Sequence, residues 1–147
     1  MKNLLIILFL VAFAQAKAQQ QEVYRLDSCR QFGNTAFDDA YIRVQQTARW
    51  KNSKTSLDDH IDKFFKQYVQ KTAGGKITIS ILINKEGKPC MYEARPNSNV
   101  RPDFKLLKAW MEQYDWLPAL QNSEAVMSIK ILQIGFSGKK ISVTELE

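Results

Sequence analysis

Two cysteines and one histidine are the side chains of this chain best suited to nucleophilic chemistry. A thiolate beside an imidazole can attack a carbonyl carbon, and such a pair requires Cys29 or Cys90 to lie close to His60. Neither cysteine stands in a recognisable local signature, and His60 lies between Asp59 and Ile61 on a predicted amphipathic helix. We therefore expect His60 to be a surface or boundary residue and the protein not to be an enzyme.

Acidic pairs and a Gly-Lys step give weaker signals. Asp38-Asp39 and Asp58-Asp59 could ligate a metal, but adjacent carboxylates near helix starts usually cap the helix and oppose its dipole. A single histidine also excludes most zinc sites. Gly138-Lys139 lacks the earlier glycine and the following Ser or Thr of a phosphate loop. We expect no catalytic, cofactor-binding or metal-binding residue, and no cofactor.

The aromatic side chains of Trp110, Tyr114 and Trp116 could form a platform for a sugar or a base. Their helical spacing and the neighbouring Pro118 favour packing in the core and at a helix end. A protein that binds a small apolar or sugar ligand between helix and sheet, near Trp110 and Trp116, is therefore our alternative function.

The cysteines can also serve structure. In an exported chain Cys29 and Cys90 can pair only with each other unless the protein dimerises, since there is no third cysteine. Their bond would close a loop of about 60 residues and stabilise the fold by about 4 kcal/mol in the chain-entropy model. Two free thiols, buried as small apolar groups, are the other alternative.

Export is predicted from residues 1–18, which have the layout of a secretory signal peptide. Lys2 gives a basic start, an apolar run covers residues 4–14, and small residues alternate at Ala14, Ala16 and Ala18. That run is about half as long as the roughly 20 residues that cross a bilayer. We expect a cleaved signal, no lipid anchor, and a periplasmic or secreted chain without a membrane span.

Residues 19–147 are the size of a single domain with one core. The formal charge of +6 falls to +4 when Lys2 and Lys17 leave with the signal. Because basic residues are interleaved with acidic ones along the chain, we expect no nucleic-acid partner.

Two helices are predicted before the first long strand. Helical spacing of apolar residues covers Phe37 to Ala48, including Tyr41 and Val44. Ser56 is the predicted N-cap of the second helix, which begins at Leu57 with acidic residues in its first turn.

Beyond Gly75 the apolar period becomes two, with an isoleucine at every second position from Ile77 to Ile83. A turn at 84–87 leads to a second strand in which Cys90, Tyr92 and Ala94 share a face. A helix then begins at Pro102-Asp103 and ends at residues 116–119. The last long strand covers 126–136, where a bulge near Ile131-Leu132 or burial of both faces would explain a slip in the apolar phase. A short strand at 141–143 follows.

This order predicts an α+β fold. Helices would cover one face of a small antiparallel sheet with a β-β-α-β core at residues 75–136, preceded by one or two extra N-terminal helices.

The segment 75–136 resembles the C-terminal domain of TonB-type energy transducers, particularly the periplasmic versions of Bacteroidetes. The resemblance lies in the strand and turn 77–87, with Gly87, in Asp103 at the helix start, in Trp116-Leu117-Pro118-Ala119, and in residues 122–126. It covers a little under half of the precursor. The family motif residues are thus Gly87, Asp103, Trp116 and Pro118.

The resemblance implies a sheet of about three strands on a helix, acting through protein–protein contact in the periplasm. In that family the last strand of the sheet can pair with an extended segment of an outer-membrane receptor, which is strand addition. Carried over, this makes Ser128, Lys130 and Leu132 candidates for the exposed binding edge. The implied partner is a protein of the cell envelope.

This chain departs from the family in several respects. A transducer needs a retained membrane helix and a long proline-rich span, and we find neither here. Ser123 also stands where the family often has glycine, and an extra helical region is predicted before Leu57. We therefore expect a free-standing interaction module that transduces no energy of its own.

Overall fold

The computed structural model describes residues 22–52 and 54–146. The helical elements are η1 (Arg30–Phe32), α2 (Leu57–Phe65) and α3 (Phe104–Met111). The strands are β1 (Tyr24–Arg25), β2 (Arg49–Trp50), β3 (Gly74–Ile83), β4 (Pro89–Ser98), β5 (Trp116–Leu117), β6 (Ala119–Gln121), β7 (Glu124–Val126), β8 (Ser128–Ser137) and β9 (Lys140–Leu146).

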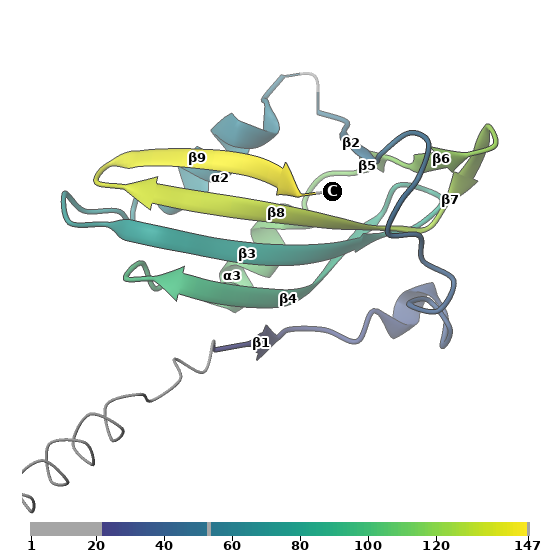
Figure 1. Ribbon diagram of the computed structural model, residues 1–147, viewed down its shortest axis with the longest axis horizontal. Coiled ribbons are helices and arrows are strands. Elements are labelled where there is room, and N and C mark those ends of the chain that lie inside the picture. The colour runs from purple at the N-terminus through teal and green to yellow at the C-terminus, as the bar shows by residue number, and fades with distance from the viewer. Residues whose placement is uncertain (1–21, 53, 147) are drawn as a thin grey trace, which may run out of the picture.

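Five strands form one antiparallel sheet in the order β1-β4-β3-β8-β9 (Figure 1). The central strand β3 pairs with β4 on one side and along its full length with β8 on the other. On its far side β8 pairs with β9, from Ile131↔Leu146 to Ser137↔Lys140. Two small sheets, β2–β5 and β6–β7, stand apart from the main one.

The predicted α+β fold class, with helices covering a small sheet, is wrong. Of the residues that the structure describes, 41% lie in strands and 16% in helices, and the sheet has five strands. The segment from Phe37 to Ala48, predicted as a helix, contains turns, bends and isolated bridges instead.

The helical spacing in that segment has another origin, because its apolar residues contact different parts of the molecule. The Phe37 ring packs edge-on against Tyr92, with centroids 4.8 Å apart, while Tyr41 forms a parallel bridge to Ser128. Ala48 lies in the main core. Tertiary contacts to the sheet therefore override a local period that favours a helix.

The core is centred on the isoleucines of β3. Ile77, Ile79, Ile81 and Ile83 are fully buried, as the alternating pattern predicts. Apolar side chains from α2 and α3 belong to the same cluster, and both helices lie behind the sheet in Figure 1. The contributing helix residues are Leu57, Ile61, Phe64, Phe65, Phe104, Leu107 and Met111.

Local signals at helix starts and at the hairpin turn are confirmed. The Ser56 hydroxyl accepts a hydrogen bond from the Asp59 amide at 3.0 Å, and the Asp103 carboxylate caps α3. In the turn, the Gly87 amide donates to the Asn84 carbonyl at 2.9 Å. These features depend on neighbouring residues alone, which is why sequence reveals them.

The faces of β4 differ from the prediction, and in β8 the structure decides between the two predicted alternatives. The pairing of β3 with β4 shifts between Ser80 and Ile81, so that Tyr92 is bulged and Ala94 joins Met91 on the core face. No such shift occurs in β8 at Ile131-Leu132. Both faces of β8 are partly or fully buried there, and this explains why apolar residues change from one face of the strand to the other.

Helix α3 ends earlier than predicted, at Met111, and Trp116-Leu117 form strand β5 instead of a helix end. No helix in the described ranges is long and apolar enough to cross a membrane. The predicted signal peptide, residues 1–18, lies outside the described residues.

The opposite face of the sheet is partly covered by an irregular segment. We call residues 24–41, which include β1 and η1, the strap. A second apolar cluster joins the strap to β3, β4 and the residue before β8, and it consists of Cys29, Ala36, Leu82, Cys90 and Met127. The sheet therefore has helices on one face and the strap on part of the other.

Candidate strand-addition site

The two edges of the main sheet differ in whether they are covered. At the β4 edge, β1 pairs through Tyr24↔Ala94 and Arg25↔Glu93, and the Leu26 amide donates to the Tyr92 carbonyl at 2.8 Å. The strap thus occupies this edge at the middle of β4.

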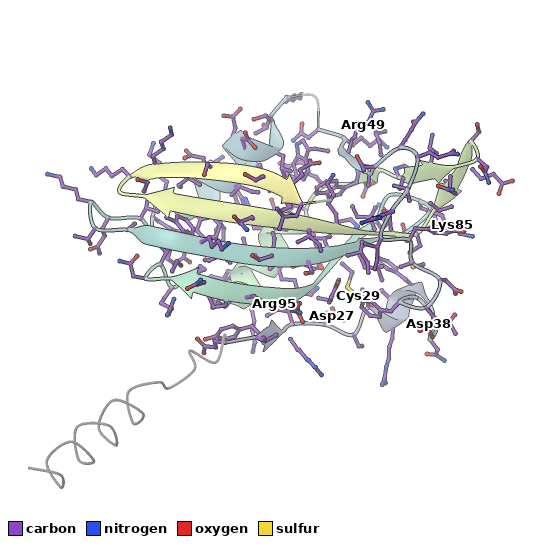
Figure 2. All side chains as sticks on the ribbon, in the orientation of Figure 1. Asp27, Cys29, Asp38, Arg49, Lys85 and Arg95 are labelled. Carbon is purple, nitrogen blue, oxygen red and sulfur yellow. A yellow bond between two sulfur atoms is a disulfide. The ribbon has the colours of Figure 1, made fainter. Side chains whose placement is uncertain are left out.

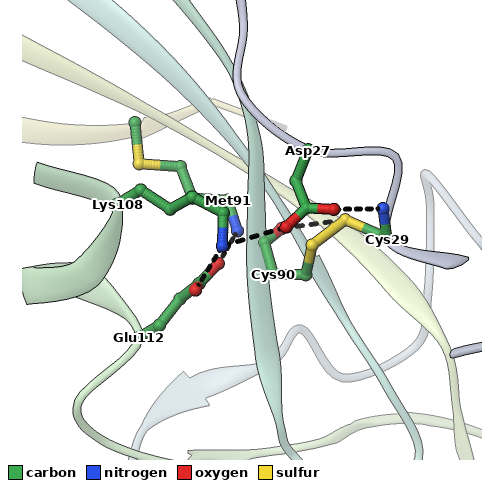
Figure 3. The surroundings of a disulfide bond; sticks show 6 residues. All are labelled: Asp27, Cys29, Cys90, Met91, Lys108 and Glu112. Carbon is green, nitrogen blue, oxygen red and sulfur yellow. Dashed lines mark hydrogen bonds and ion pairs between the residues drawn. A yellow bond between two sulfur atoms is a disulfide. The ribbon is translucent and has the colours of Figure 1, made fainter. Parts of the chain in front are cut away.

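A disulfide fixes the strap to this edge. Cys29 and Cys90 are bonded and fully buried, with Cα atoms 6.0 Å apart and a sequence separation of 61 (Figure 3). The disulfide alternative is confirmed and the free-thiol alternative is excluded. Because both sulfurs are bonded, neither cysteine can act with His60 as a nucleophile, and Asp27 beside them has no thiolate with which to share a metal.

Charged groups hold the same region from the side of α3. The Lys108 ammonium lies 3.1 Å from the Asp27 carboxylate and 2.5 Å from that of Glu112, which also accepts the Met91 amide at 2.6 Å. The Cys29 amide donates to Asp27 at 2.9 Å. This hydrogen bond, together with Lys108, lowers the pKa of Asp27, although partial burial opposes the shift.

The other edge of the sheet is strand β9, which is open. The Ile129 amide of β8 donates to the Tyr41 carbonyl, on the side of β8 away from β3. Every second residue from Ile129 therefore points its N–H and C=O groups to the side of β8 where β9 lies. In the observed register, Ile141, Val143 and Glu145 of β9 then direct their N–H and C=O groups away from the sheet. No hydrogen bond from another described residue reaches these groups.

Strand β9 lacks two of the devices that usually protect an edge, a bulge and a proline, although it carries the charged residues Lys140 and Glu145. Its register with β8 is unbroken over seven pairs, and the strand contains no proline. Ile141 and Val143 pack on the core, while Ser142 and Thr144 belong to the opposite face. An exposed, regular edge of this kind can accept a further strand.

The predicted edge residues Ser128, Lys130 and Leu132 lie elsewhere, which corrects their expected exposure. They are buried in β8 and pair with Ile83, Ile81 and Ile79 of β3. The physical reason is that the side of β8 left open in the three-stranded picture is covered, by β9 from Ile131 onward and by Tyr41 at Ser128. The sequence predicts a short strand at 141–143, which corresponds to β9, but does not show that this strand is the edge.

The four motif residues are only partly brought together. The turn at Gly87 touches Trp116 and lies near Pro118, since a Cβ atom on Gly87 would be 3.6 Å from the proline ring. Asp103 is separate from them, and its carboxylate accepts hydrogen bonds from the Lys105 and Leu106 amides at 2.8 and 3.3 Å. These contacts give all four residues a structural role.

A buried histidine fills the space among the aromatic rings, and the pocket of about 620 Å³ that borders Trp110 lies between α2 and α3 and not between helix and sheet. The His60 ring stacks on Trp110 with centroids 4.7 Å apart and also contacts Trp50 and Tyr114. Its Nε2–H donates to the Trp110 carbonyl at 3.0 Å, and burial lowers the pKa of His60. Trp116 is itself buried against Trp50. The prediction of a surface or boundary histidine is therefore wrong.

A groove of about 890 Å³ lies at the end of the open edge. Its walls are residues 42–49, the start of β8 at residues 128–130, and Glu145 and Leu146 at the end of β9. The sequence does not reveal this groove, because the apolar spacing of residues 42–49 predicts a helix there. The only hint in the sequence is that Ile42 interrupts the polar side of that predicted helix.

Comparison with known proteins gives no relative: no family model, curated protein or solved structure matches this chain. The resemblance to TonB C-terminal domains therefore stays a prediction.

Proposed function

We propose that this protein is a periplasmic interaction module that binds an extended segment of an envelope protein by strand addition and transduces no energy of its own. The observation that carries the proposal is the open edge of β9, where three residues direct their main-chain groups outward. The predicted signal peptide and the TonB-like sequence pattern support the location and the kind of partner.

Recognition would take place at one edge only. The β4 edge is occupied by β1 and tied down by the Cys29–Cys90 bond, whereas β9 is free along its length in the described part of the chain. A segment beside β9 would gain hydrogen bonds to Ile141, Val143 and Glu145, which supply affinity with little regard to sequence.

Selectivity would come from alternate side chains of the bound segment. Side chains of the bound segment on the helix-covered face of the sheet would lie near α2, which packs against β9. Those on the opposite face would lie near Ser142 and Thr144. In Figure 1, α2 lies behind β9 and so backs the first of these two faces. A segment with apolar residues at every second position fits this arrangement.

The test is crosslinking in native envelopes, followed by identification of the captured protein, with Val143→Pro compared against Val143→Ala. The Val143 N–H points away from β8, so proline removes an outward donor and no bond of the β8–β9 ladder. Alanine loses similar packing and keeps the donor. We expect capture by the wild type and the alanine variant and loss of capture by the proline variant.

Circular dichroism and thermal melting of both variants are the control for folding. If a folded Val143→Pro protein captures the partner as well as Val143→Ala does, strand addition at β9 is wrong. Absence of any specific partner in native envelopes would contradict the function as a whole.

The alternative function, a small apolar or sugar ligand near Trp110 and Trp116, gains no support from the packing of His60 and Trp50 in that space. We propose no second function.

A further inference from the structure

The groove at the end of β9 continues the line of the open edge. Glu145 and Leu146 form one side of it and residues 42–49 another, so a strand that follows β9 past Leu146 runs into this groove. Arg49, on the wall of the groove, lies beyond the β9 edge of the sheet, whereas Asp27 and Cys29 of the strap lie at the β4 edge (Figure 2). The groove is thus associated with the open edge and not with the covered one.

Among the described residues, the positive charge in the groove is only partly neutralised. Lys130 is buried there, and its ammonium pairs with the carboxylate of Glu145. Arg43 and Arg49 also line the groove, are exposed, and form no ion pair with any residue in the described ranges. Arg43 and Arg49 thus line the groove without a carboxylate partner from those residues.

Apolar surface lies beside these charges. Ile42 is 68% exposed and Leu146 is 39% exposed, and both line the same groove. Neighbouring apolar and cationic groups match a peptide that carries an apolar and an acidic residue close together. A phosphate-rich polymer would use the arginines but would leave Ile42 and Leu146 uncovered.

We propose that this groove binds a carboxylate of the extended peptide that pairs with β9, and that Arg43 and Arg49 are the residues that recognise it. The inference rests on the proposed strand addition and adds the chemistry of the partner, an acidic segment. A planar guanidinium suits this role because it can donate two parallel hydrogen bonds to one carboxylate. The carboxylate can belong to an Asp or Glu side chain or to a chain end.

The experiment uses labelled synthetic peptides of alternating threonine and valine, with affinity read by fluorescence anisotropy. One peptide carries two glutamates at its carboxyl end, and a matched peptide has two glutamines in the same places. Each of the two is made once with a free carboxyl terminus and once with an amidated one. We expect the acidic peptides to bind about tenfold more tightly than the fully neutral one, with a difference that shrinks as salt is raised. The amidated arms separate side-chain from terminal carboxylates.

The decisive variant is Arg43→Gln/Arg49→Gln, with Lys85→Gln/Arg30→Gln as a control that removes the same charge away from the groove. We expect the first variant to bind acidic and neutral peptides alike and the control to keep the preference. A preference that survives in Arg43→Gln/Arg49→Gln would overturn the assignment. So would equal binding of acidic and neutral peptides by the wild type.

The two proposals fail in different ways. If the wild type shows no preference yet Val143→Pro weakens all peptides, strand addition stands and carboxylate recognition is wrong. If no peptide binds the wild type, both are wrong. Tighter binding of a single-stranded oligonucleotide or of anionic vesicles than of the acidic peptide would also overturn the inference.

Discussion

Gly87 and Trp116 are in direct backbone contact. The Trp116 amide donates to the Gly87 carbonyl at 2.7 Å, and a Cβ atom on Gly87 would lie 1.9 Å from the Trp116 carbonyl oxygen. The φ angle of Gly87 is also +81°, a conformation that side chains disfavour. This contact, together with the ion pair between Lys88 and Asp115 at 2.8 Å, holds the hairpin turn against strand β5.

Gly87→Ala is therefore expected to reduce the free energy of unfolding by at least about 2 kcal/mol, since left-handed strain adds to a clash with the backbone. Gly74→Ala is the matched control, because a Cβ there meets nothing within 4 Å and its φ is not positive. Urea titration followed by tryptophan fluorescence measures both. Equal stability of the two variants would show that β5 moves away from the turn at little cost.

Removal of the disulfide should loosen the strap. Cys29→Ser/Cys90→Ser is expected to lose about 4 kcal/mol of stability in the chain-entropy model, with native strain reducing that figure. Hydrogen exchange should accelerate first at the Leu26 amide, which bonds to Tyr92, and in the other strap residues. Unchanged protection in the strap would mean that β1 and the Asp27–Lys108 pair hold it without the covalent bond.

His60 predicts a fall in stability under mildly acidic conditions. Burial lowers its folded pKa below the unfolded value, so the unfolded chain binds a proton that the folded protein excludes. Stability is therefore full above about pH 6.5 and falls as the pH drops through the interval below it. Denaturant titrations between about pH 7.5 and pH 5 test this, and His60→Gln should flatten the slope despite its lower stability. A wild-type slope equal to that of the variant would contradict the prediction.

Asp103 caps α3 with one carboxylate oxygen that accepts two amides. Asp103→Ala should cost about 1 kcal/mol, whereas Asp103→Asn keeps an acceptor and should lose only a few tenths. Thermal melting of the two variants compares them directly. Equal losses would indicate that the negative charge near the helix start matters more than the hydrogen bonds.

The elements predicted correctly from sequence are those that depend on near neighbours. The isoleucines of β3 alternate because one face of the strand is buried, and Ser56 and Asp103 cap helices through amides two or three residues away. The turn at Gly87 is equally local. For such features the residue and its partner stand together in the printed sequence.

The features missed depend on contacts between distant segments. Residues 37–48 have a helical period but bond to the start of β8 through Tyr41, and the period carries no information about that partner. Whether Lys130 is exposed or buried depends on whether the end of β9, with Glu145, packs beside it. The open edge and its groove could therefore be located only in three dimensions.

The disulfide-tethered strap limits how many molecules can join through their sheets. In each chain no described strand covers the β9 edge, whereas β1 covers the middle of the β4 edge, so a second copy that paired through its own β9 would leave only the partly covered β4 edges for a third. Such assembly would stop at a closed dimer with a continuous sheet across both chains. By fixing the strap at the β4 edge, the Cys29–Cys90 bond opposes the growth of longer sheet assemblies through that edge.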